Sequence, residues 1–212
     1  MSKKTAGRSV LASRLLVGMF LLVGMVMMAG TVTPASASAG SGATPGPDVG
    51  DLASLTRPVS VLPSWQGSVL ELHNEYRAAV GVAPLHWSSS LTNDAQRWAD
   101  HLAATHQPQH SPPQTRPGQG ENLAWGTKGA YHMLQLARLW TAEQPNFIPG
   151  EPFGNEASKT GNWTDIGHYT QIIWWNTAAV GCGMASDTSE DYLVCRYAPA
   201  GNVWGQYPLG HP

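Results

Sequence analysis

His168 and His110 are the side chains in this sequence whose surroundings first indicate chemistry. His168 precedes the apolar run of residues 172–174. In a short helix that begins near Asp165, it lies one turn from the buried residues, at the edge of the core, where it can face a cleft. The alternative is a core histidine that is held by one backbone carbonyl. His110 precedes Ser111 in a loop, and loops carry function more often than core positions do.

Glu121 is a carboxylate that the sequence places among apolar side chains. The alternation in residues 120–125 predicts a short strand in which Glu121 shares a face with Leu123 and Trp125. Burying a carboxylate on such a face is costly unless the group is paired, hydrogen-bonded or bound to a metal. Glu121 therefore needs a partner, unless its side chain extends to solvent at the end of the strand.

Glu143 poses the same problem on a helix. A helix predicted over residues 128–144 buries Trp140, and Glu143 falls one turn later on the same face before Pro145 ends the helix. Its alternative is again a side chain that extends to solvent at the end of the element. The two histidines are the obvious partners for the two glutamates.

Predicted helices and loops surround these four residues. Apolar periodicity indicates a first helix over residues 66–80, and a second that begins at the serine caps 88–90 and ends near Thr105. The loop that carries His110 is rich in proline and glycine. Residues 146–166 form a second excursion, which is long enough to be a rim or lid over a cleft.

Residues 1–37 are predicted to be a signal peptide. A basic segment is followed by the apolar run 15–28 and then by small residues that suit cleavage after Ala37 or Ala39. A retained anchor is the alternative, but the apolar run is shorter than the ~20 residues that a spanning helix needs. We therefore expect a secreted, extracellular protein with no stable membrane anchor after cleavage.

Residues 38–63 are rich in Gly, Pro, Ser and Ala and predict a linker, so the folded domain should span residues 64–212. Without the signal peptide the chain keeps eight Lys and Arg against fourteen Asp and Glu, a net charge of −6. Its cations are scattered, so nucleic acid is excluded as a partner. Acidity also disfavours electrostatic adsorption to anionic membranes, but it leaves hydrophobic lipid binding open.

Cys182 and Cys195 are the two cysteines of the chain, and both belong to the exported part. Apolar runs at residues 180–185 and 192–198 flank a polar turn and predict a hairpin that places the two sulfurs on neighbouring strands. We therefore expect a disulfide, which contributes roughly 3 kcal/mol for a loop of this size. A metal site with two cysteine ligands is the alternative.

Two segments, residues 167–177 and 192–203, resemble the signature motifs of the CAP superfamily. This superfamily contains the cysteine-rich secretory proteins, antigen 5 and the plant pathogenesis-related proteins of group one. Shorter matches occur in the same order along the chain: His73-Asn74-x-x-Arg77, Leu85-x-Trp87, His110-Ser111, Gly120-Glu121-Asn122-Leu123 and Gly205-Gln206. Together they cover about residues 70–207, which is nearly the whole predicted domain.

The resemblance implies an α/β fold of the α+β type, a three-layer α-β-α sandwich with a small, mainly antiparallel sheet. In that family two histidines and two glutamates converge in an open cleft. The matching tetrad consists of His110, Glu121, Glu143 and His168. Supporting positions implied by the same motifs are Ser111, Asn122, Tyr169 and Gln171.

The resemblance also implies functions for the cleft. Two imidazoles and two carboxylates suit Zn²⁺ or another divalent metal, as some family members bind. The first hypothesis is a secreted, non-catalytic binding module for a sterol, a fatty acid or another lipid. A metal-dependent extracellular hydrolase, with metal-bound water or Ser111 as nucleophile, is disfavoured because no nucleophile elbow surrounds Ser111 and four ligands leave a metal no open position. A defence or host-interaction protein that acts through its surface is the third hypothesis.

Overall fold

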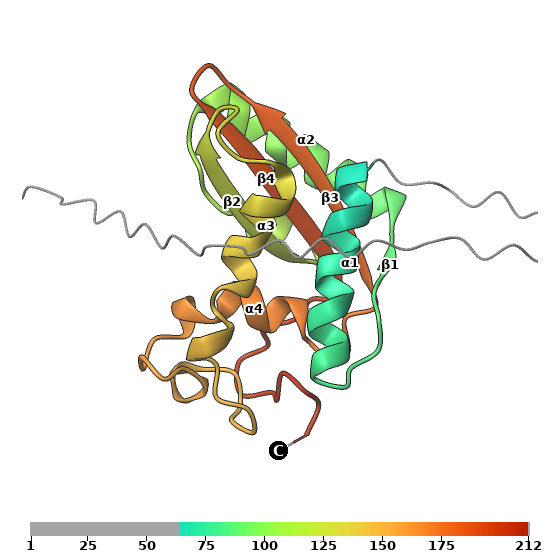
Figure 1. The fold of residues 1–212 in the computed structure, drawn as a ribbon, viewed down its shortest axis with the longest axis vertical. Helices are drawn as coiled ribbons and strands as arrows, with labels where there is room; N and C mark the ends of the chain where they lie inside the picture. Colours follow the sequence, from blue (N-terminus) through green and yellow to red (C-terminus); the bar gives the residue numbers. More distant parts are fainter. Residues whose placement is uncertain (1–63, 212) are drawn as a thin grey trace, which may run out of the picture. The chain divides into compact units, whose positions relative to one another are not determined.

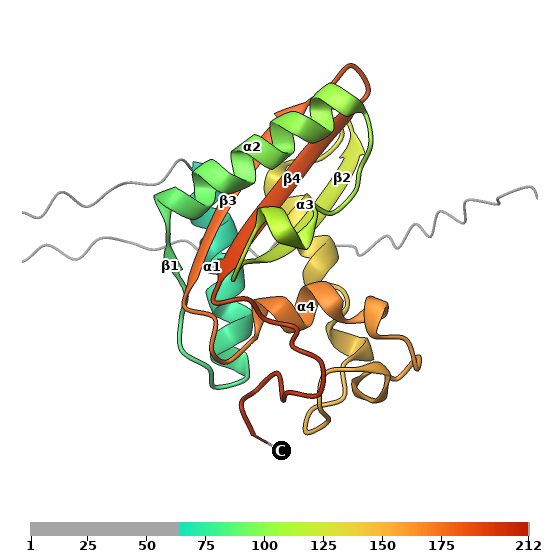
Figure 2. The ribbon, with the colours of Figure 1, turned by 180° about the vertical axis from the view of Figure 1, so that it is seen from behind.

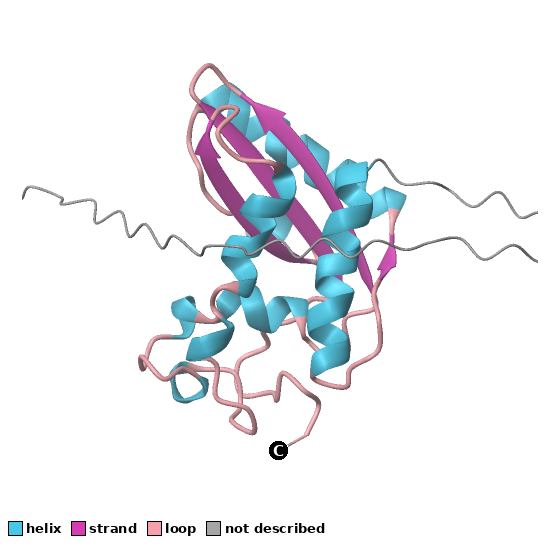
Figure 3. Cartoon of the chain, in the orientation of Figure 1, coloured by secondary structure: helices cyan, strands magenta, loops and turns pink. Residues whose placement is uncertain are grey.

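The computed structural model describes residues 64–211. Figure 3 shows the long loops gathered at one end of the sheet, around a short helix. In chain order the helices and strands are α1 (Ser64–Ala79), β1 (His86–Trp87), α2 (Ser89–Thr105), β2 (Gly120–Thr127), α3 (Met133–Thr141), α4 (Gly167–Ile172), β3 (Ala179–Ser186) and β4 (Glu190–Ala198). Short 3₁₀ turns lie at Pro113–Thr115, Gln144–Asn146, Asn155–Ala157 and Trp163–Asp165.

The sheet has the strand order β1-β3-β4-β2. Its two larger ladders are antiparallel, and only the short pairing of β1 with β3 is parallel. Helices α1 and α3 cover one face in Figure 1, and α2 covers the other face in Figure 2. The molecule is therefore the three-layer α-β-α sandwich with a mainly antiparallel sheet that the motifs implied.

Helix α1 contributes buried polar side chains as well as apolar ones. His73 and Arg77 are fully buried beside Val69 and Leu72. Arg77 donates hydrogen bonds to the backbone carbonyls of Ala83, Ile172, Trp174 and Thr177. Both buried side chains of the His73-Asn74-x-x-Arg77 motif are therefore structural hydrogen-bonding groups.

Helix α2 lies directly on strand β3. A Cβ atom at Gly183 would come within 2.4 Å of the backbone of Gln96, and one at Gly181 within 2.3 Å of the Thr92 nitrogen. Gln96 in turn bonds both backbone groups of Met184 with its side-chain amide. The absence of side chains at the two glycines thus allows the helix to approach the strand closely. The Gln96 amide hydrogen-bonds backbone groups at the edge of β3 that lie beyond the end of the short strand β1.

Two sequence predictions need correction in this region. The third helix begins at Met133 rather than near residue 128, because Gly129 adopts a positive φ of 72° and its N–H bonds the Asp191 carboxylate. It also ends at Thr141, so Glu143 follows the helix instead of lying on its buried face. Trp125 lies on β2 as predicted, but its side chain is 45% exposed near the end of the strand.

The predicted hairpin and disulfide are both present. Cys182 and Cys195 are register partners on β3 and β4, and their sulfurs are bonded. They belong to the core between the sheet and α1 with α3, whereas Leu123, Tyr192 and Val194 form the core beneath α2. The disulfide therefore joins the two central strands of the sheet inside the larger core.

The predicted signal peptide (residues 1–37) and linker (residues 38–63) lie outside the described residues. Within residues 64–211, no helix is both long enough and apolar enough to cross a membrane.

Candidate functional site

A cleft of about 490 Å³ opens where the start of β2, helix α4 and three loop segments meet. Its lining combines two histidines, a glutamate, amides and one arginine with three aromatic rings. The lining residues are His110, Arg116, Gly120, Glu121, Asn122, Phe153, Trp163, Thr164, Gly167, His168, Gln171, Ala200, Gly201, Asn202 and Trp204. A cavity of this volume falls within the range of small-molecule sites in proteins.

His110 and Glu121 form one half of the polar floor. The imidazole Nδ1 lies 2.7 Å from Glu121 Oε1, and because a carboxylate only accepts, Nδ1 carries the proton. Ser111 donates to the same carboxylate from its backbone N–H and its hydroxyl. Arg196, directly opposite Glu121 in the β2–β4 ladder, completes the set with Nη2 at 3.1 Å from Oε2. Glu121 therefore has the partners that its position on a buried face requires.

The charge of Glu121 is stabilised although its side chain is fully buried. Burial, the largest effect, raises the pKa of the Glu121 carboxyl. The hydrogen bonds from His110 and Ser111 and the charge of Arg196 together outweigh burial, so the pKa is lowered overall. The carboxylate thus stays ionised and holds the histidine ring in one orientation.

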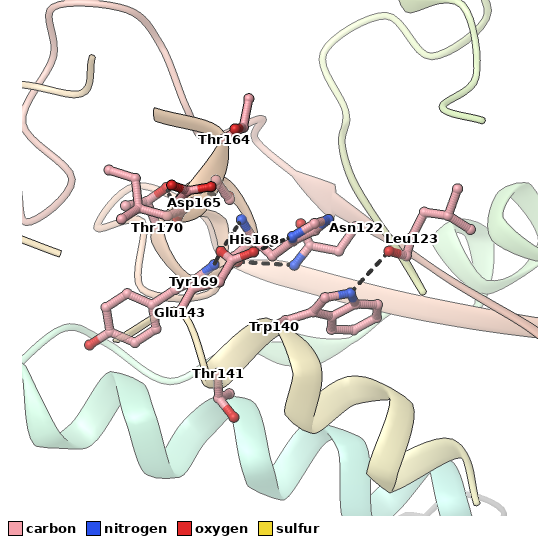
Figure 4. A network of polar contacts seen from close by, with 12 residues as sticks. Asn122, Leu123, Trp140, Thr141, Glu143, Thr164, Asp165, His168, Tyr169 and Thr170 are labelled. Carbon is pink, nitrogen blue, oxygen red and sulfur yellow. Dashed lines mark hydrogen bonds and ion pairs between the residues drawn. The ribbon is translucent and has the colours of Figure 1, made fainter. Parts of the chain in front are cut away.

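His168 and Glu143 form the other half of the floor, as Figure 4 shows. His168 Nδ1 lies 2.6 Å from Glu143 Oε1, so this ring too has its proton on Nδ1. Oε2 accepts the backbone N–H groups of His168 and Tyr169, in the first turn of α4. Glu143 therefore both orients the ring and satisfies donors at the start of the helix, which also suit a negative charge.

The two imidazole rings face each other across the cleft. Their centroids are 6.4 Å apart and their planes differ by 29°, and the centroid of the Trp140 ring lies 6.3 Å from that of His168. Among the described residues, no hydrogen bond occupies Nε2 of His110 or His168. In the neutral form of each ring, Nε2 is an acceptor at the cleft.

Asn122 connects the floor to the core. Its amide donates to the backbone carbonyl of His168 and to the hydroxyl of Tyr197, each at 3.1 Å. The Tyr197 hydroxyl also bonds Nε2 of His73, whose Nδ1 donates to the carbonyl of Val69. This chain of hydrogen bonds fixes α4 against β4 and α1, and with it the position of His168.

Gln171 and two glycines shape the rear wall of the cleft. The Gln171 side chain is 2% exposed, and its Oε1 accepts the backbone N–H of Gly201. A Cβ atom at Gly120 would lie 1.9 Å from that oxygen, and one at Gly201 would lie 2.7 Å from Nε2. Any larger residue at either glycine would displace this amide.

Aromatic rings form the rim. Phe153 lies at the centre, with its ring 5.9 Å from that of Trp163 and 6.2 Å from that of Trp204. The two tryptophans are 40% and 62% exposed. The excursion of residues 146–166, predicted as a rim or lid, supplies Phe153 and Trp163, whereas Trp204 comes from the segment after β4.

The site residues predicted from the sequence take distinct places. His110, Glu121, Asn122, His168 and Gln171 line the cleft. Ser111 is 1% exposed and serves as a donor to Glu121, while Tyr169 turns its ring into the core against Tyr76 and Phe147 and supports Glu143 only through its backbone.

Arg196, Arg116 and Trp204 are functional candidates that the sequence analysis missed. A signal existed for Arg196, because a lone charge within the apolar strand run of residues 192–198 needs a buried partner. The positions of Arg116 and Trp204 gave none, because both lie in loops whose course depends on tertiary packing.

The tetrad is not arranged as a ready four-ligand metal site. In residues 64–211 no group of three or more His, Cys, Asp or Glu side chains is placed to hold a metal ion. Each glutamate already accepts from the Nδ1 of its histidine. The two Nε2 atoms remain as nitrogen donors of a type that divalent metals accept, with the glutamates orienting them from behind.

Comparison with known proteins gives consistent matches. A sequence model of the cysteine-rich secretory protein family, CAP, matches residues 70–197. The human Golgi-associated plant pathogenesis-related protein 1 is 36% identical over 145 residues, which cover 68% of this chain and 88% of that protein. Pathogenesis-related protein 1C of Nicotiana tabacum is 35% identical over 144 residues, which cover 68% and 80%.

The fold comparison agrees. The crystal structure of NaASP2 with Zn²⁺ superposes with a TM-score of 0.60 at 22% identity, covering 73% of this chain and 90% of that chain. An identity of 22% shows only that the two proteins share a fold. The family is shown by the family model that matches residues 70–197 and by the human and Nicotiana tabacum relatives, which are 36% and 35% identical. The chain belongs to the CAP family and is a CAP-domain protein of the pathogenesis-related protein 1 type.

Proposed function

We propose that this protein is a secreted binding module that takes up one small amphiphilic lipid, a sterol or a fatty acid, in the cleft. The observation that carries the proposal is the division of the cleft into an aromatic rim and a polar floor. Trp163 and Trp204, packed on the buried ring of Phe153, offer apolar surface at the entrance, and His110 and His168 offer hydrogen-bonding nitrogens below. An amphiphile matches both parts with its apolar body and its polar end.

The polar floor also favours binding over hydrolysis. Ser111 Oγ donates to Glu121 rather than to a histidine base, and its side chain is buried beneath the floor. Glu121 could accept the proton of this hydroxyl, but a serine nucleophile also needs access to the substrate, which the burial of Ser111 denies. The third hypothesis, action through the surface, predicts that replacing all four tetrad residues leaves biological activity intact.

The direct test measures binding of tritiated cholesterol and tritiated laurate to the purified protein. We expect stoichiometric binding of at least one of them, weakened about tenfold by the double change Trp163→Ala, Trp204→Ala, because two aromatic contacts are lost. Trp125→Ala is the matched control, since Trp125 is similarly exposed but does not line the cleft. Failure of both lipids to bind would refute lipid capture in this cleft.

A divalent metal such as Zn²⁺ is a second proposal for the same floor. Two imidazoles that each donate Nδ1–H to a carboxylate have the arrangement that orients histidine ligands in metal sites. His110 and His168 would hold the ion, and a bound cation would supply a Lewis acid or a positive charge for a ligand oxygen. One protein of the same fold was crystallised with Zn²⁺.

Calorimetric titration with zinc tests this second proposal. Stoichiometric heat that disappears in the double variant His110→Ala, His168→Ala would place the ion between the two rings. Glu143→Gln should weaken zinc binding about tenfold without abolishing it, because the glutamate orients a ligand rather than binding the metal. If neither wild type nor Glu143→Gln gives heat, the floor is a hydrogen-bonded tetrad without metal.

Secretion is proposed from the predicted signal peptide. Mass spectrometry of the protein recovered from culture medium should show a mature chain that begins after Ala37 or Ala39. Recovery of the intact chain from the membrane fraction would support the retained anchor instead.

A further inference from the structure

Arg116 is the one cleft residue whose charge the surrounding structure leaves uncompensated. Glu121 forms an ion pair with Arg196 and accepts a hydrogen bond from His110, and Glu143, outside the cleft lining, accepts hydrogen bonds from His168 and from two backbone N–H groups. Within residues 64–211, Arg116 forms no ion pair, although its side chain lines the cleft beside Glu121. Each oxygen of the Glu121 carboxylate already accepts two donors, which come from His110, Ser111 and Arg196. Glu121 therefore does not form an ion pair with Arg116 as well.

The guanidinium of Arg116 is held from one side by backbone carbonyls. Its Nε donates to the carbonyl of Ser111 at 3.4 Å, and its Nη1 donates to the carbonyl of Gln119 at 2.8 Å. The loop between these carbonyls is closed by the 3₁₀ turn Pro113–Thr115, whose last residue bonds Pro112 through backbone and hydroxyl. In the described chain no hydrogen bond engages Nη2 of Arg116. The guanidinium is thus held in place through Nε and Nη1, and its Nη2 is available to a ligand.

A second guanidinium, that of Arg196, lies near Arg116 but is paired with Glu121. Arg196 lies beneath the floor, 4% exposed, with its Nε unpaired, and Arg116 is close enough that its charge lowers the pKa of Arg196. Burial is the largest cause of that lowered pKa, ahead of the opposing charge of Glu121. Asp94 and Arg97 also act on Arg196, but these two are paired with each other, as Glu121 is with Arg196. Arg116 is therefore the cation of this group that lines the cleft without an ion-pair partner among the described residues.

We propose that Arg116 recognises an anionic oxygen headgroup, so that the cleft prefers a single-chain carboxylate or phosphate amphiphile over a neutral alcohol or sterol. Guanidinium groups bind planar and tetrahedral oxyanions through paired, charge-assisted hydrogen bonds. An alcohol can reach only the weaker, uncharged hydrogen-bonding groups of the floor, whereas an oxyanion gains the charge-assisted bond to Arg116. The inference rests on the proposed lipid-binding function and names the ligand class and the residue that selects it.

The test compares two ligands that share one alkyl chain. Laurate and 1-dodecanol differ only in the charged carboxylate, and both are titrated at pH 7.5 into wild type, Arg116→Gln and Arg116→Lys. We expect wild type to bind laurate at least tenfold more tightly than 1-dodecanol, and Arg116→Gln to lose about tenfold for laurate while leaving 1-dodecanol unchanged. Arg116→Lys should keep part of the preference for laurate, because lysine keeps the positive charge but lacks the planar guanidinium that donates paired hydrogen bonds.

Two controls show whether the effect comes from Arg116 itself or from the overall charge of the protein. Arg138→Gln removes an exposed charge on α3 outside the cleft and should leave both affinities unchanged, and raising the salt concentration should weaken laurate binding selectively. Equal binding of laurate by wild type and Arg116→Gln, or equal affinity of wild type for the two ligands, would overturn the inference while the lipid-binding function stands. Failure of wild type to bind either ligand would overturn the inference, and failure to bind cholesterol as well would overturn the lipid-binding function.

A headgroup without a chain distinguishes an amphiphile from a free anion. Inorganic phosphate and acetate are titrated into wild type under the same conditions. Binding of laurate much more tightly than acetate supports an anionic lipid, because the chain then contributes through the aromatic rim. Binding of phosphate as tightly as laurate would overturn the lipid assignment and leave a site for a free anion.

Discussion

Two glutamates at the floor of the cleft show how one residue type acquires different roles. Each accepts Nδ1–H from a histidine, but Glu121 is fully buried against Arg196, whereas the side chain of Glu143 is 16% exposed and that of its histidine 30% exposed. In the first case the protein alone compensates the charge. In the second, water and two backbone N–H groups share that task.

Removing the charge of Glu121 should therefore cost more than removing that of Glu143. We expect Glu121→Gln to lower the free energy of unfolding by about 3 kcal/mol, since Arg196 would keep a buried charge without its carboxylate. Glu143→Gln should lower it by about 1 kcal/mol, because the remaining amide oxygen still accepts a bond. Urea denaturation of the two variants measures both losses, and losses of equal size would contradict this account.

His73 should make stability depend on pH. Burial, partly offset by the hydrogen bond to Val69 and reinforced by the charge of Arg77, lowers the pKa of His73 from 6.5 to about 4. Between those values the unfolded chain binds a proton that the folded protein does not. The histidine's contribution is therefore complete above about pH 6.5 and is lost as the pH falls toward 4, a change of about 3 kcal/mol.

Urea denaturation across pH 4 to 7 measures this dependence. The slope of the unfolding free energy against pH should decrease in His73→Gln, whatever the variant's absolute stability. His101→Gln is the matched control, because His101 is exposed on α2. An unchanged slope in His73→Gln would show that other groups cause the pH dependence.

At the scale of elements, the contact between α2 and β3 depends on residues that lack side chains. Gly181 and Gly183 lie on the face of β3 toward α2, and the backbone of the helix occupies the space where their Cβ atoms would be. This contact presses α2 onto the face that also carries Glu121 and Arg196. The helix thereby excludes water from the ion pair beneath the cleft.

A single methyl group at this contact should be destabilising. Gly183→Ala is expected to lower the free energy of unfolding by about 2 kcal/mol, because backbone atoms of Gln96 must move. Gly67→Ala on α1 is the matched control, with no atom within 4 Å of the new methyl, and should raise stability by up to about 1 kcal/mol through helix propensity. Thermal unfolding compares the two, and a change of the same sign in both would contradict the packing argument.

At the scale of the whole molecule, the cleft is built from parts of the chain that are far apart in sequence. The loop before β2, the excursion 146–166, α4 and the segment after β4 all contribute. The last of these is held by backbone bonds of Phe153 with Gln206 and Gly205, and by Asn202, which bonds Gly167 and Thr170 of α4. The rim is therefore held together by bonds between loop segments and α4 that are far apart in sequence.

The disulfide should matter at this scale, because it constrains the unfolded chain and joins the two central strands. Replacing both Cys182 and Cys195 with serine is expected to lower the free energy of unfolding by about 3 kcal/mol, given their separation of 13 residues. The double variant and wild type are compared by urea denaturation, with wild type in reductant as a second measure. Unchanged stability in both measurements would contradict the expected contribution.

The sequence alone determined the family and the three-layer fold through the motif resemblance, and it also determined the second helix from the serine caps 88–90 to near Thr105, the hairpin with its disulfide and the rim character of residues 146–166. These features follow from local periodicity, capping residues and motifs that occupy short segments. The sequence also showed that Glu121 and Glu143 needed partners, because a carboxylate among apolar residues is costly wherever the chain folds.

Only the tertiary structure decided which partners they have. The pairing of Glu121 with Arg196 depends on the register of β2 against β4, and that register is set by contacts between segments about 70 residues apart. The early end of α3, the exposure of Trp125 and the meeting of Trp163 with Trp204 around Phe153 depend in the same way on neighbours from other segments. Periodicity states which face of an element is buried, but packing between distant elements decides what lies against that face.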